Sequence, residues 1–303
     1  MMKSAPIYVE RMIHAPLDVL WDATQIPEQH QVWDLRFTEI QYLPKGAPDL
    51  PQQFLYTTRI GFGVAIFGKG ESLGTRSSSV NGESTSALKF WSDDRLSLIQ
   101  KGAGYWKYIP DDNHVKFLTW YDYHTRFGLL GRMMDWIFRP MLGWATALSF
   151  DCLGIWLEKG IHPRLSFERF AVQWTVRWTL CAIWIYQGLV PKMMFPDTGE
   201  LQILRSVGLP SGQGLWILEL MGVAEIGLGL LNIMVRDSRA FFSLQIIILG
   251  CLVTGAMLGQ FSVLVAPFNP VTLTLSMVGL AVVGIVTMRD IPSASHCERK
   301  PSK

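Results

Sequence analysis

Charged and apolar residues are unevenly distributed along the chain. Most charges lie in residues 1–165, whereas none occurs between residues 240 and 288, a run interrupted by the polar break APFNP. A helix that crosses a bilayer needs roughly 20 mostly apolar residues. The last third of the chain therefore predicts membrane-spanning helices, and we expect the part before it to be held at the membrane.

The apolar pattern of the last third predicts an all-α bundle of four membrane-spanning helices. The expected spans are residues 170–190, 215–235, 241–265 and 271–288. Basic residues such as Arg169, Arg239 and Arg289 gather on the side that holds both chain ends, whereas Lys192 and Arg205 on the other side are offset by acidic residues. By the positive-inside rule, we expect both termini in the cytoplasm and the bundle in a membrane of the cell inner membrane type.

The pattern before residue 160 predicts an α+β domain. A strand over 7–14 precedes short helices over 16–21 and 26–34, and a long helix over 130–159 contains Pro140, which should kink or divide it. The strands expected between them are 36–43, 53–67, 70–79, 85–91, 96–101, 104–109 and 114–127. In the last strand the odd-numbered positions should face inward. A curved sheet that grips a long helix leaves a cavity between the two.

Composition supports this division and excludes several classes of protein. Of the 303 residues 49% are hydrophobic and 17% charged, against about 25% charged in a typical soluble domain. The net charge of +2 gives no reason to expect a nucleic-acid partner. Four cysteines without a CxxC motif predict reduced thiols, and the N-terminus has no apolar segment typical of a cleavable signal peptide. We expect domains at 1–160 and 170–288, a linker at 161–169 and a polar, mobile tail at 289–303.

The first domain resembles the SRPBCC superfamily, the START-like helix-grip fold that includes polyketide cyclase-like proteins. The resemblance rests on VERMIHAPLDVLWD at 9–22, WDLRFTEI at 33–40 and YDYHTRFG at 121–128. It implies a cavity that binds hydrophobic ligands, with catalysis in only some members. Aromatic and hydroxyl side chains are typical of the wall of such a pocket. The candidates are Tyr56, Thr58, Phe62, Trp91, Tyr105, Thr119, Tyr121 and Tyr123, although each alone could be an ordinary core residue.

The second domain resembles the DoxX-like family of four-helix membrane proteins. The resemblance rests on WIYQGLVPKMMFP at 184–196 and LELMGVAEIGLGLL at 218–231. Some members of that family are associated with membrane-bound, quinone-linked oxidoreductases. Trp174, Trp184 and Trp216 are expected to anchor at the membrane surface, where indole rings prefer to lie.

Ionisable residues inside the predicted spans are the strongest chemical signal in the sequence. A charge in the middle of a bilayer costs at least ~2.5–3.5 kcal/mol, so it normally faces the bundle interior with a partner. From their depths we expect Arg177 to pair with Glu225, and Glu219 to form a polar cluster with Tyr186 and Gln187. These groups could fix helix packing, relay protons or contact a quinone headgroup.

Close helix packing is also encoded in the third span. Gly255 and Gly259 have the GxxxG spacing, which could serve the bundle or a homo-oligomer.

Catalytic motifs are absent from the sequence. It contains no HExxH, GxSxG, P-loop or dinucleotide-binding glycine motif, and its six histidines show no metal-ligand spacing. No metal site and no cofactor is evident, although a quinone is possible. The leading hypothesis is a membrane protein whose cytoplasmic domain binds a lipid or isoprenoid-like molecule. One alternative is a subunit of a quinone-linked oxidoreductase with a membrane redox partner, and another is a ligand-sensing scaffold. Whether the protein is an enzyme is left open.

Overall fold

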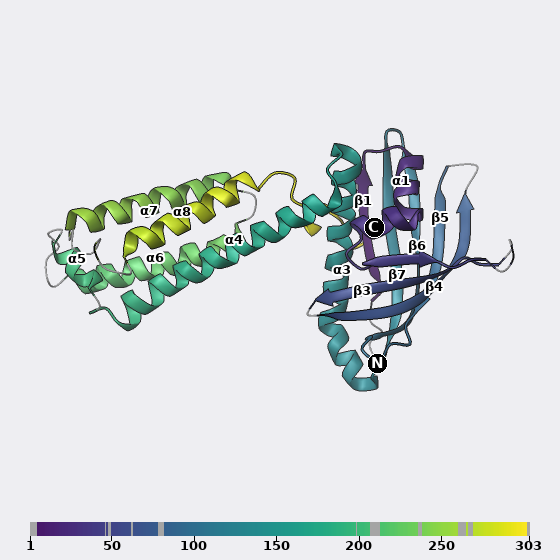
Figure 1. Ribbon diagram of the computed structural model, residues 1–303, viewed down its shortest axis with the longest axis horizontal. Coiled ribbons are helices and arrows are strands. Elements are labelled where there is room, and N and C mark those ends of the chain that lie inside the picture. The colour runs from purple at the N-terminus through teal and green to yellow at the C-terminus, as the bar shows by residue number, and fades with distance from the viewer. Residues whose placement is uncertain are drawn as a thin grey trace. The chain divides into compact units, whose positions relative to one another are not determined.

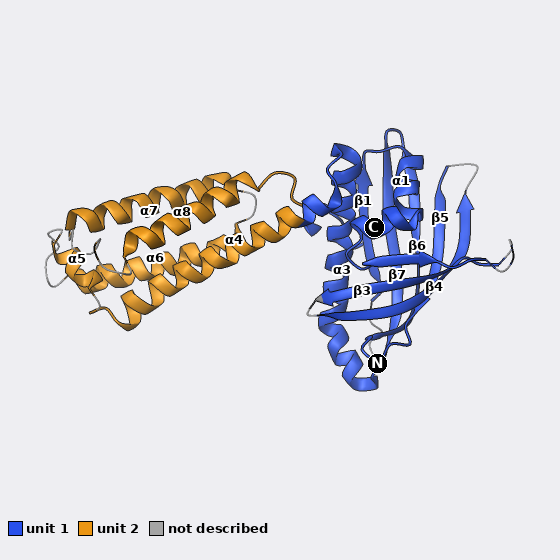
Figure 2. Cartoon of the chain, in the orientation of Figure 1, with its two compact units in different colours: residues 1–167, 292–303 blue, residues 168–291 orange. Residues whose placement is uncertain are grey.

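The chain folds into two compact units. The computed structural model describes residues 5–45, 47, 50–61, 63–77, 82–197, 199–206, 213–235, 238–259, 265 and 269–301. Unit 1 is made of residues 1–167 and 292–303, and unit 2 is made of residues 168–291, as Figure 2 shows in blue and orange. Unit 1 is therefore built from two stretches of chain that flank unit 2 in the sequence.

Unit 1 contains an antiparallel sheet of seven strands in the order β1-β7-β6-β5-β4-β3-β2 (Figure 1). The strands are β1 Ile7–Ile13, β2 Glu39–Tyr42, β3 Gln53–Gly61, β4 Val64–Ser77, β5 Ser84–Trp91, β6 Ile99–Asp111 and β7 His114–Thr125. Every neighbouring pair is antiparallel, and β7, the last strand in the sequence, pairs with β1, the first. This order brings the N-terminal strand beside β7, where the long helix that follows can cover both.

Three helices accompany the sheet: α1 Leu17–Gln25, α2 Pro27–Trp33 and α3 Gly128–Lys159. Pro16 and Pro27 stand at the starts of the first two, where a missing backbone N–H costs nothing. Helix α3 begins after Phe127, whose positive φ turns the chain sharply, and it runs on through Pro140 as one helix. The antiparallel sheet with a long C-terminal helix resembles the START-like layout that the sequence predicts, although Pro140 does not divide the helix.

The inner face of the sheet is lined by aromatic side chains that lie across glycines of the next strand. A Cβ atom on Gly68 would lie 2.1 Å from the Tyr56 ring, and one on Gly102 would lie 2.3 Å from the Phe90 ring. The sequence KGAG at 101–104 is therefore part of β6, so the expected break between strands 96–101 and 104–109 is wrong. The expected single strand over 53–67 is also wrong, because β3 and β4 form a hairpin there.

The core of unit 1 lies between this inner face and α3. Figure 1 shows α3 running alongside the sheet next to β1. Phe117 of β7 stacks on Phe150 of α3 with ring centroids 4.5 Å apart, and Trp33 of α2 packs against the same phenyl ring. Val115, Phe117, Tyr121 and Tyr123 all belong to this core. The prediction that the odd positions of this strand face inward is confirmed from Val115 to Tyr123, whereas Phe127 lies beyond β7 and is exposed.

Unit 2 is helical. Its elements are α4 Pro163–Leu189, the π-helical turn η1 Val190–Met194, α5 Glu200–Ser206, α6 Gly214–Met234, α7 Arg239–Gly259 and α8 Pro270–Val286. Apolar residues of α4, α6, α7 and α8 form one core, in which Leu180, Trp184 and Phe242 are almost completely buried. Helices α6 and α7 are long and apolar enough to cross a membrane, and α8 is apolar but has 17 residues. Helix α4 begins at Pro163, so most of the expected linker 161–169 is helical.

The chain returns to unit 1 after α8. We expected residues 289–303 to be a mobile polar tail, but Ala294 and Cys297 are buried in the core of unit 1. The backbones of Glu10 and Glu298 exchange two hydrogen bonds as an antiparallel bridge beside β1. This part of the tail prediction is wrong, because the segment buries two side chains and pairs its backbone with β1.

Candidate functional site

Glycines bring α4 and α6 into backbone contact at the candidate site. A Cβ atom on Gly188 would lie 2.4 Å from the carbonyl oxygen of Gly222, and one on Gly229 would lie 3.0 Å from that of Cys181. Small residues permit this close approach between helices that pack in a membrane. This close approach also brings Lys192 near Glu225, because Lys192 follows Gly188 by one turn and Glu225 follows Gly222 by three residues.

Lys192 and Glu225 form a buried ion pair. The Lys192 Nζ atom lies 2.9 Å from Glu225 Oε2 and 2.8 Å from Glu200 Oε2, and it donates to the carbonyl oxygen of Gln187 at 3.4 Å. The side chains of Lys192 and Glu225 are 5% and 8% exposed. One ammonium thus stands between two carboxylates that come from α5 and α6.

One oxygen of this cluster lacks a hydrogen bond. Lys192 Nζ lies at ion-pair distance from Glu225 Oε2, and this buried oxygen has no hydrogen-bond partner among the described residues. A buried polar atom without such a partner is costly, and in a native protein it calls for an explanation such as a functional role or a further bound group. The described neighbours of Glu225 thus leave part of its capacity to accept hydrogen bonds unused.

The ion pair lies in the wall of a cavity of about 480 Å³. Most of its wall is apolar, for example Trp184, Leu218 and Met277. The polar side chains of the wall are Gln187, Lys192, Glu200, Gln202, Glu225 and Thr274. Ligand pockets typically have this composition, an apolar chamber with a few convergent polar groups.

The expected pair of Arg177 with Glu225 is wrong. Arg177 Nη1 instead donates to the carbonyl oxygens of Asn232, at 3.0 Å, and Val235 at the end of α6. The long arginine side chain extends away from Glu225, towards carbonyls that the helix leaves without internal partners. Lys192, which we assigned to the outer loop, takes its place because η1 continues α4 by one more turn.

The other members of the expected polar cluster are dispersed. Gln187 lines the cavity, but Tyr186 is 59% exposed on the outside of α4 and Glu219 is exposed on α6. Gly259 packs against Ser206 and Ile203 of α5, whereas a Cβ atom on Gly255 would meet open space. The glycines that join helices in this unit are thus chiefly those of α4 and α6.

Sequence reasoning missed an uncharged polar network in unit 2. Trp184 Nε1 donates to Gln245 Oε1 at 2.8 Å, and Gln245 and Asn232 exchange hydrogen bonds at 3.1 and 3.2 Å. All three residues are buried, so Trp184 is not the interfacial anchor that we expected. The signal was present, because Gln245 and Asn232 are amides within otherwise apolar helices.

In unit 1 the expected cavity residues divide between the two faces of the sheet. Five of them lie on the inner face, because they pair across the sheet with residues of neighbouring strands that face inward. They are Tyr56, Thr58, Thr119, Tyr121 and Tyr123. Trp91 and Tyr105 lie on the outer face, where Tyr105 stacks on Trp120 at 5.9 Å. Phe62 lies outside the described residues.

A second buried ion pair lies in unit 1, between α2 and the sheet. The Arg36 guanidinium grips Asp34 with two bonds of 2.9 and 2.6 Å, and His30 Nε2 lies 3.0 Å from the same carboxylate. Burial raises the pKa of Asp34, but the charges and hydrogen bonds of Arg36 and His30 together outweigh this effect, so the pKa of that carboxyl is well below its ordinary value. Burial lowers the pKa of His30 by more than Asp34 raises it.

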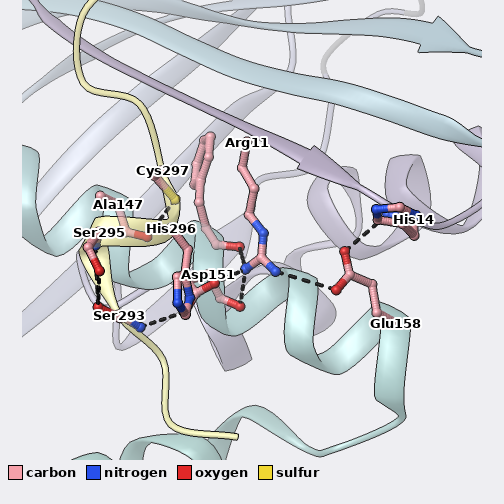
Figure 3. A network of polar contacts seen from close by, with 10 residues as sticks. Arg11, His14, Ala147, Asp151, Glu158, Ser293, Ser295, His296 and Cys297 are labelled. Carbon is pink, nitrogen blue, oxygen red and sulfur yellow. Dashed lines mark hydrogen bonds and ion pairs between the residues drawn. The ribbon is translucent and has the colours of Figure 1, made fainter. Parts of the chain in front are cut away.

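Figure 3 shows how polar contacts hold the returning chain in unit 1. The fully buried carboxylate of Asp151 in α3 pairs with Arg11 of β1 and lies 2.9 Å from His296 Nδ1. It also accepts a hydrogen bond from the backbone of Ser293. Cys297 Sγ donates to the carbonyl oxygen of Ala147 at 3.2 Å, and burial raises the pKa of this thiol to about 12. One buried charge thus joins three separate segments.

Metal ligation has no evident place in this arrangement. Among the residues that the structure describes, no group of three or more His, Cys, Asp or Glu side chains is arranged to hold a metal ion.

Comparison with known proteins gives the family. A model of the DoxX-like family matches residues 181–282. The Uncharacterized membrane protein YndG of Bacillus subtilis (strain 168) is 44% identical over 222 residues, which are 72% of this chain and 79% of that protein. The chain belongs to the YndG family of membrane proteins and contains a DoxX-like domain. The matched DoxX-like residues include Lys192 and Glu225.

Solved structures resemble the N-terminal half at low identity. A STAR-related lipid transfer protein from Xanthomonas axonopodis is 16% identical with a TM-score of 0.37, covering 50% of this chain and 85% of that one. The di-domain ARO/CYC StfQ from the steffimycin biosynthetic pathway is 12% identical with a TM-score of 0.39, covering 52% and 53%. We draw nothing further from these likenesses.

Proposed function

We propose that this YndG family member binds a small amphipathic molecule within its membrane unit, at the Lys192–Glu225 ion pair. The observation that carries the proposal is the Lys192–Glu225 pair in the cavity wall, in which the buried Glu225 Oε2 atom lacks a hydrogen bond among the described residues. The chain's own lysine neutralises one of the two nearby carboxylates, so the site does not require a cationic ligand. It offers an acceptor to a molecule that brings a donor.

The chemistry of the cavity narrows the class of ligand. Its volume of about 480 Å³ suits one small molecule, because binding pockets typically measure about 300–1,000 Å³. The apolar walls favour a hydrocarbon body, and Glu225 favours a hydroxyl head that donates a hydrogen bond. An isoprenoid alcohol and a quinol both meet these requirements. A quinol would need a membrane redox partner to receive its electrons.

The return of the chain to unit 1 supports a four-span arrangement. Residues before and after unit 2 fold together, so both ends of unit 2 must leave a membrane on the same side. The number of crossings is then even. Two helices qualify by length and composition, and α4 and α8 share one core with them, which favours four crossings over two. The positive-inside rule then favours a cytoplasmic position for unit 1, as expected for a membrane of the cell inner membrane type.

Ligand retention tests the site directly. The full chain is purified in detergent, and its extracted small molecules are identified by mass spectrometry. Glu225→Gln keeps the shape of the side chain but removes the charged acceptor, and Leu218→Trp fills the cavity with a larger ring, since Leu218 is completely buried there. We expect both variants to lose a molecule that the wild-type protein retains.

Leu220→Trp is the matched control, because Leu220 lies on the same helix but is 59% exposed. This variant should retain the ligand. Equal retention by the wild type and the Glu225→Gln and Leu218→Trp variants would contradict the proposal, as would the absence of any retained molecule from the wild type.

Unit 1 offers a second candidate site for a hydrophobic ligand. A depression of about 560 Å³ is lined by Leu17, Asp18, Trp21, Ser77 and Ser84, where α1 approaches β4 and β5. The expected cavity residues that lie on the inner face of the sheet belong to unit 1 as well. If lipid co-purifies with the Glu225→Gln variant but is lost from a Trp21→Ala variant, the ligand belongs to unit 1 instead.

A further inference from the structure

Helix α3 has two halves with different surroundings. Every residue from Thr146 to Ile155 is buried, because the sheet, α2 and the returning chain surround that half. The preceding half carries eight large apolar side chains that are exposed. They are Leu129, Leu130, Met133, Met134, Trp136, Ile137, Met141 and Trp144.

These side chains form one continuous face, which we call the α3 apolar face. At 100° per residue they fall within an arc of about 160° around the helix. Trp136 is 82% exposed and Leu129 is 74% exposed. The charged residues of this half, Arg132, Asp135 and Arg139, all lie outside the arc. A contiguous apolar face of this size on a soluble unit marks an interaction site.

We propose that the α3 apolar face lies in the surface layer of the lipid bilayer, so that unit 1 is itself a peripheral membrane module. The first argument is its composition. Transient protein interfaces are about as polar as the rest of a protein surface, whereas this arc contains no charged and no hydrogen-bonding side chain except the two indoles. Tryptophan is the residue that prefers the bilayer interface.

The second argument is proximity along the chain. Helix α3 ends at Lys159 and the membrane unit begins at Glu168, so only residues 160–167 separate them. The nearest residue of the face, Trp144, precedes Lys159 by 15 helical residues, or about 22 Å at 1.5 Å per residue. Because residues 160–167 link α3 to the membrane unit, the bilayer is always near the α3 apolar face. A second copy of the protein would instead have to reach this face by diffusion.

The third argument is the charge beside the face. Arg132 is exposed at its margin, where a guanidinium can reach lipid phosphates. Arg139 at the same margin instead pairs with Asp122 at 2.7 Å and Asp135 at 2.9 Å, and it covers the Tyr123 ring. These contacts hold the first half of α3 against β7, so the apolar face is presented by a fixed helix.

Depth-dependent quenching tests this placement with the full chain. The protein is reconstituted at one copy per nanodisc of phosphatidylcholine and phosphatidylglycerol, with and without brominated acyl chains. A bimane label is attached to Trp136→Cys in a Cys251→Ser background, because Cys251 is the exposed native thiol among the described residues. We expect brominated lipid to quench this label severalfold.

Two labelled positions calibrate the result. Asn113→Cys in the exposed turn between β6 and β7 should be unaffected, and Leu220→Cys on the outside of α6 should be quenched. Adding Ile137→Asp should relieve quenching at position 136. If brominated lipid quenches the label at position 136 no more than the label at position 113, the proposal is wrong. Burial of the label only in discs with two copies would also overturn it, because the face would then be assigned to a dimer.

Discussion

Each unit of the protein contains a buried ion pair, and the two pairs are built differently. In unit 1 Asp34 and Arg36 are two residues apart in the sequence and meet through two bonds, with His30 as a third member. In unit 2 Lys192 and Glu225 come from different helices, and one carboxylate oxygen remains without a hydrogen bond beside a cavity.

The difference is the one we expect between a pair that stabilises the fold and a pair that binds a ligand. A buried pair is stabilising only when geometry and further hydrogen bonds satisfy both charges, which Asp34 and Arg36 achieve among themselves and their neighbours. The Lys192–Glu225 pair is incompletely satisfied although it is equally buried. We therefore expect changes in the first pair to alter stability, and changes in the second to alter ligand binding.

The largest effect is expected for Asp34→Ala, which leaves the Arg36 charge buried without its carboxylate. Breaking a buried pair in this way typically costs about 3–5 kcal/mol in the free energy of unfolding. For a unit of this size the loss corresponds to a fall in melting temperature on the order of 10 °C. The temperature at which Cys152 and Cys297 react with maleimide measures it, because both thiols are buried in unit 1.

Asp34→Ala combined with Arg36→Met is the control for this experiment. If the buried charge causes the loss, the double variant should be more stable than the single one, because a methionine needs no counter-ion. Equal melting temperatures of the single and double variants would show that Asp34 does not stabilise unit 1 by neutralising the Arg36 charge.

A smaller effect is expected on acidification, and His30 is its source. Since its folded pKa is lower than its ordinary value of 6.5, the unfolded chain takes up the proton first as the pH falls. The free energy of unfolding of unit 1 should fall below pH 6.5 by up to about 1.4 kcal/mol per pH unit, until the folded pKa is reached. His30→Gln, which keeps a neutral donor for Asp34, should flatten this dependence between pH 7 and 5.

The smallest effect on stability is expected for Lys192→Met combined with Glu225→Gln. Removing both charges from an imperfect buried pair is often neutral, so the temperature at which the buried Cys181 of unit 2 becomes reactive should change little. Ligand retention should nevertheless be lost. If the temperature of Cys181 reactivity falls strongly and the ligand is still retained, the Lys192–Glu225 pair stabilises the fold and does not bind the ligand.

Much of the fold follows from local pattern. The two-residue period of β7 indicates a strand, and the long apolar runs of α6, α7 and α8 indicate helices, so the existence and type of these elements could be predicted. The errors arose where packing overrides local chemistry. Gly102 and Gly104 suggested a turn, but they make room for Phe90 and Tyr121 on neighbouring strands, which only the sheet register brings close.

The candidate site was less accessible to sequence reasoning. Glu225 could be singled out because a carboxylate in an apolar helix is costly, but its partner could not be identified from depth alone. The π-helical turn that carries Lys192 back into the bundle has no sequence signature beyond Pro191. The close contact of Gly188 with Gly222 depends on the crossing of two helices, which their separate sequences do not determine.

The returning chain has a consequence for how the protein is made. Residues 292–301 leave the ribosome after all of unit 2, yet Ala294 and Cys297 complete the core of unit 1 and His296 and Ser293 contact the buried Asp151. Unit 1 thus reaches its final packing only once the membrane helices have been synthesised. A chain interrupted in α8 would leave Asp151 without these partners, so the final packing of unit 1 depends on the complete synthesis of unit 2.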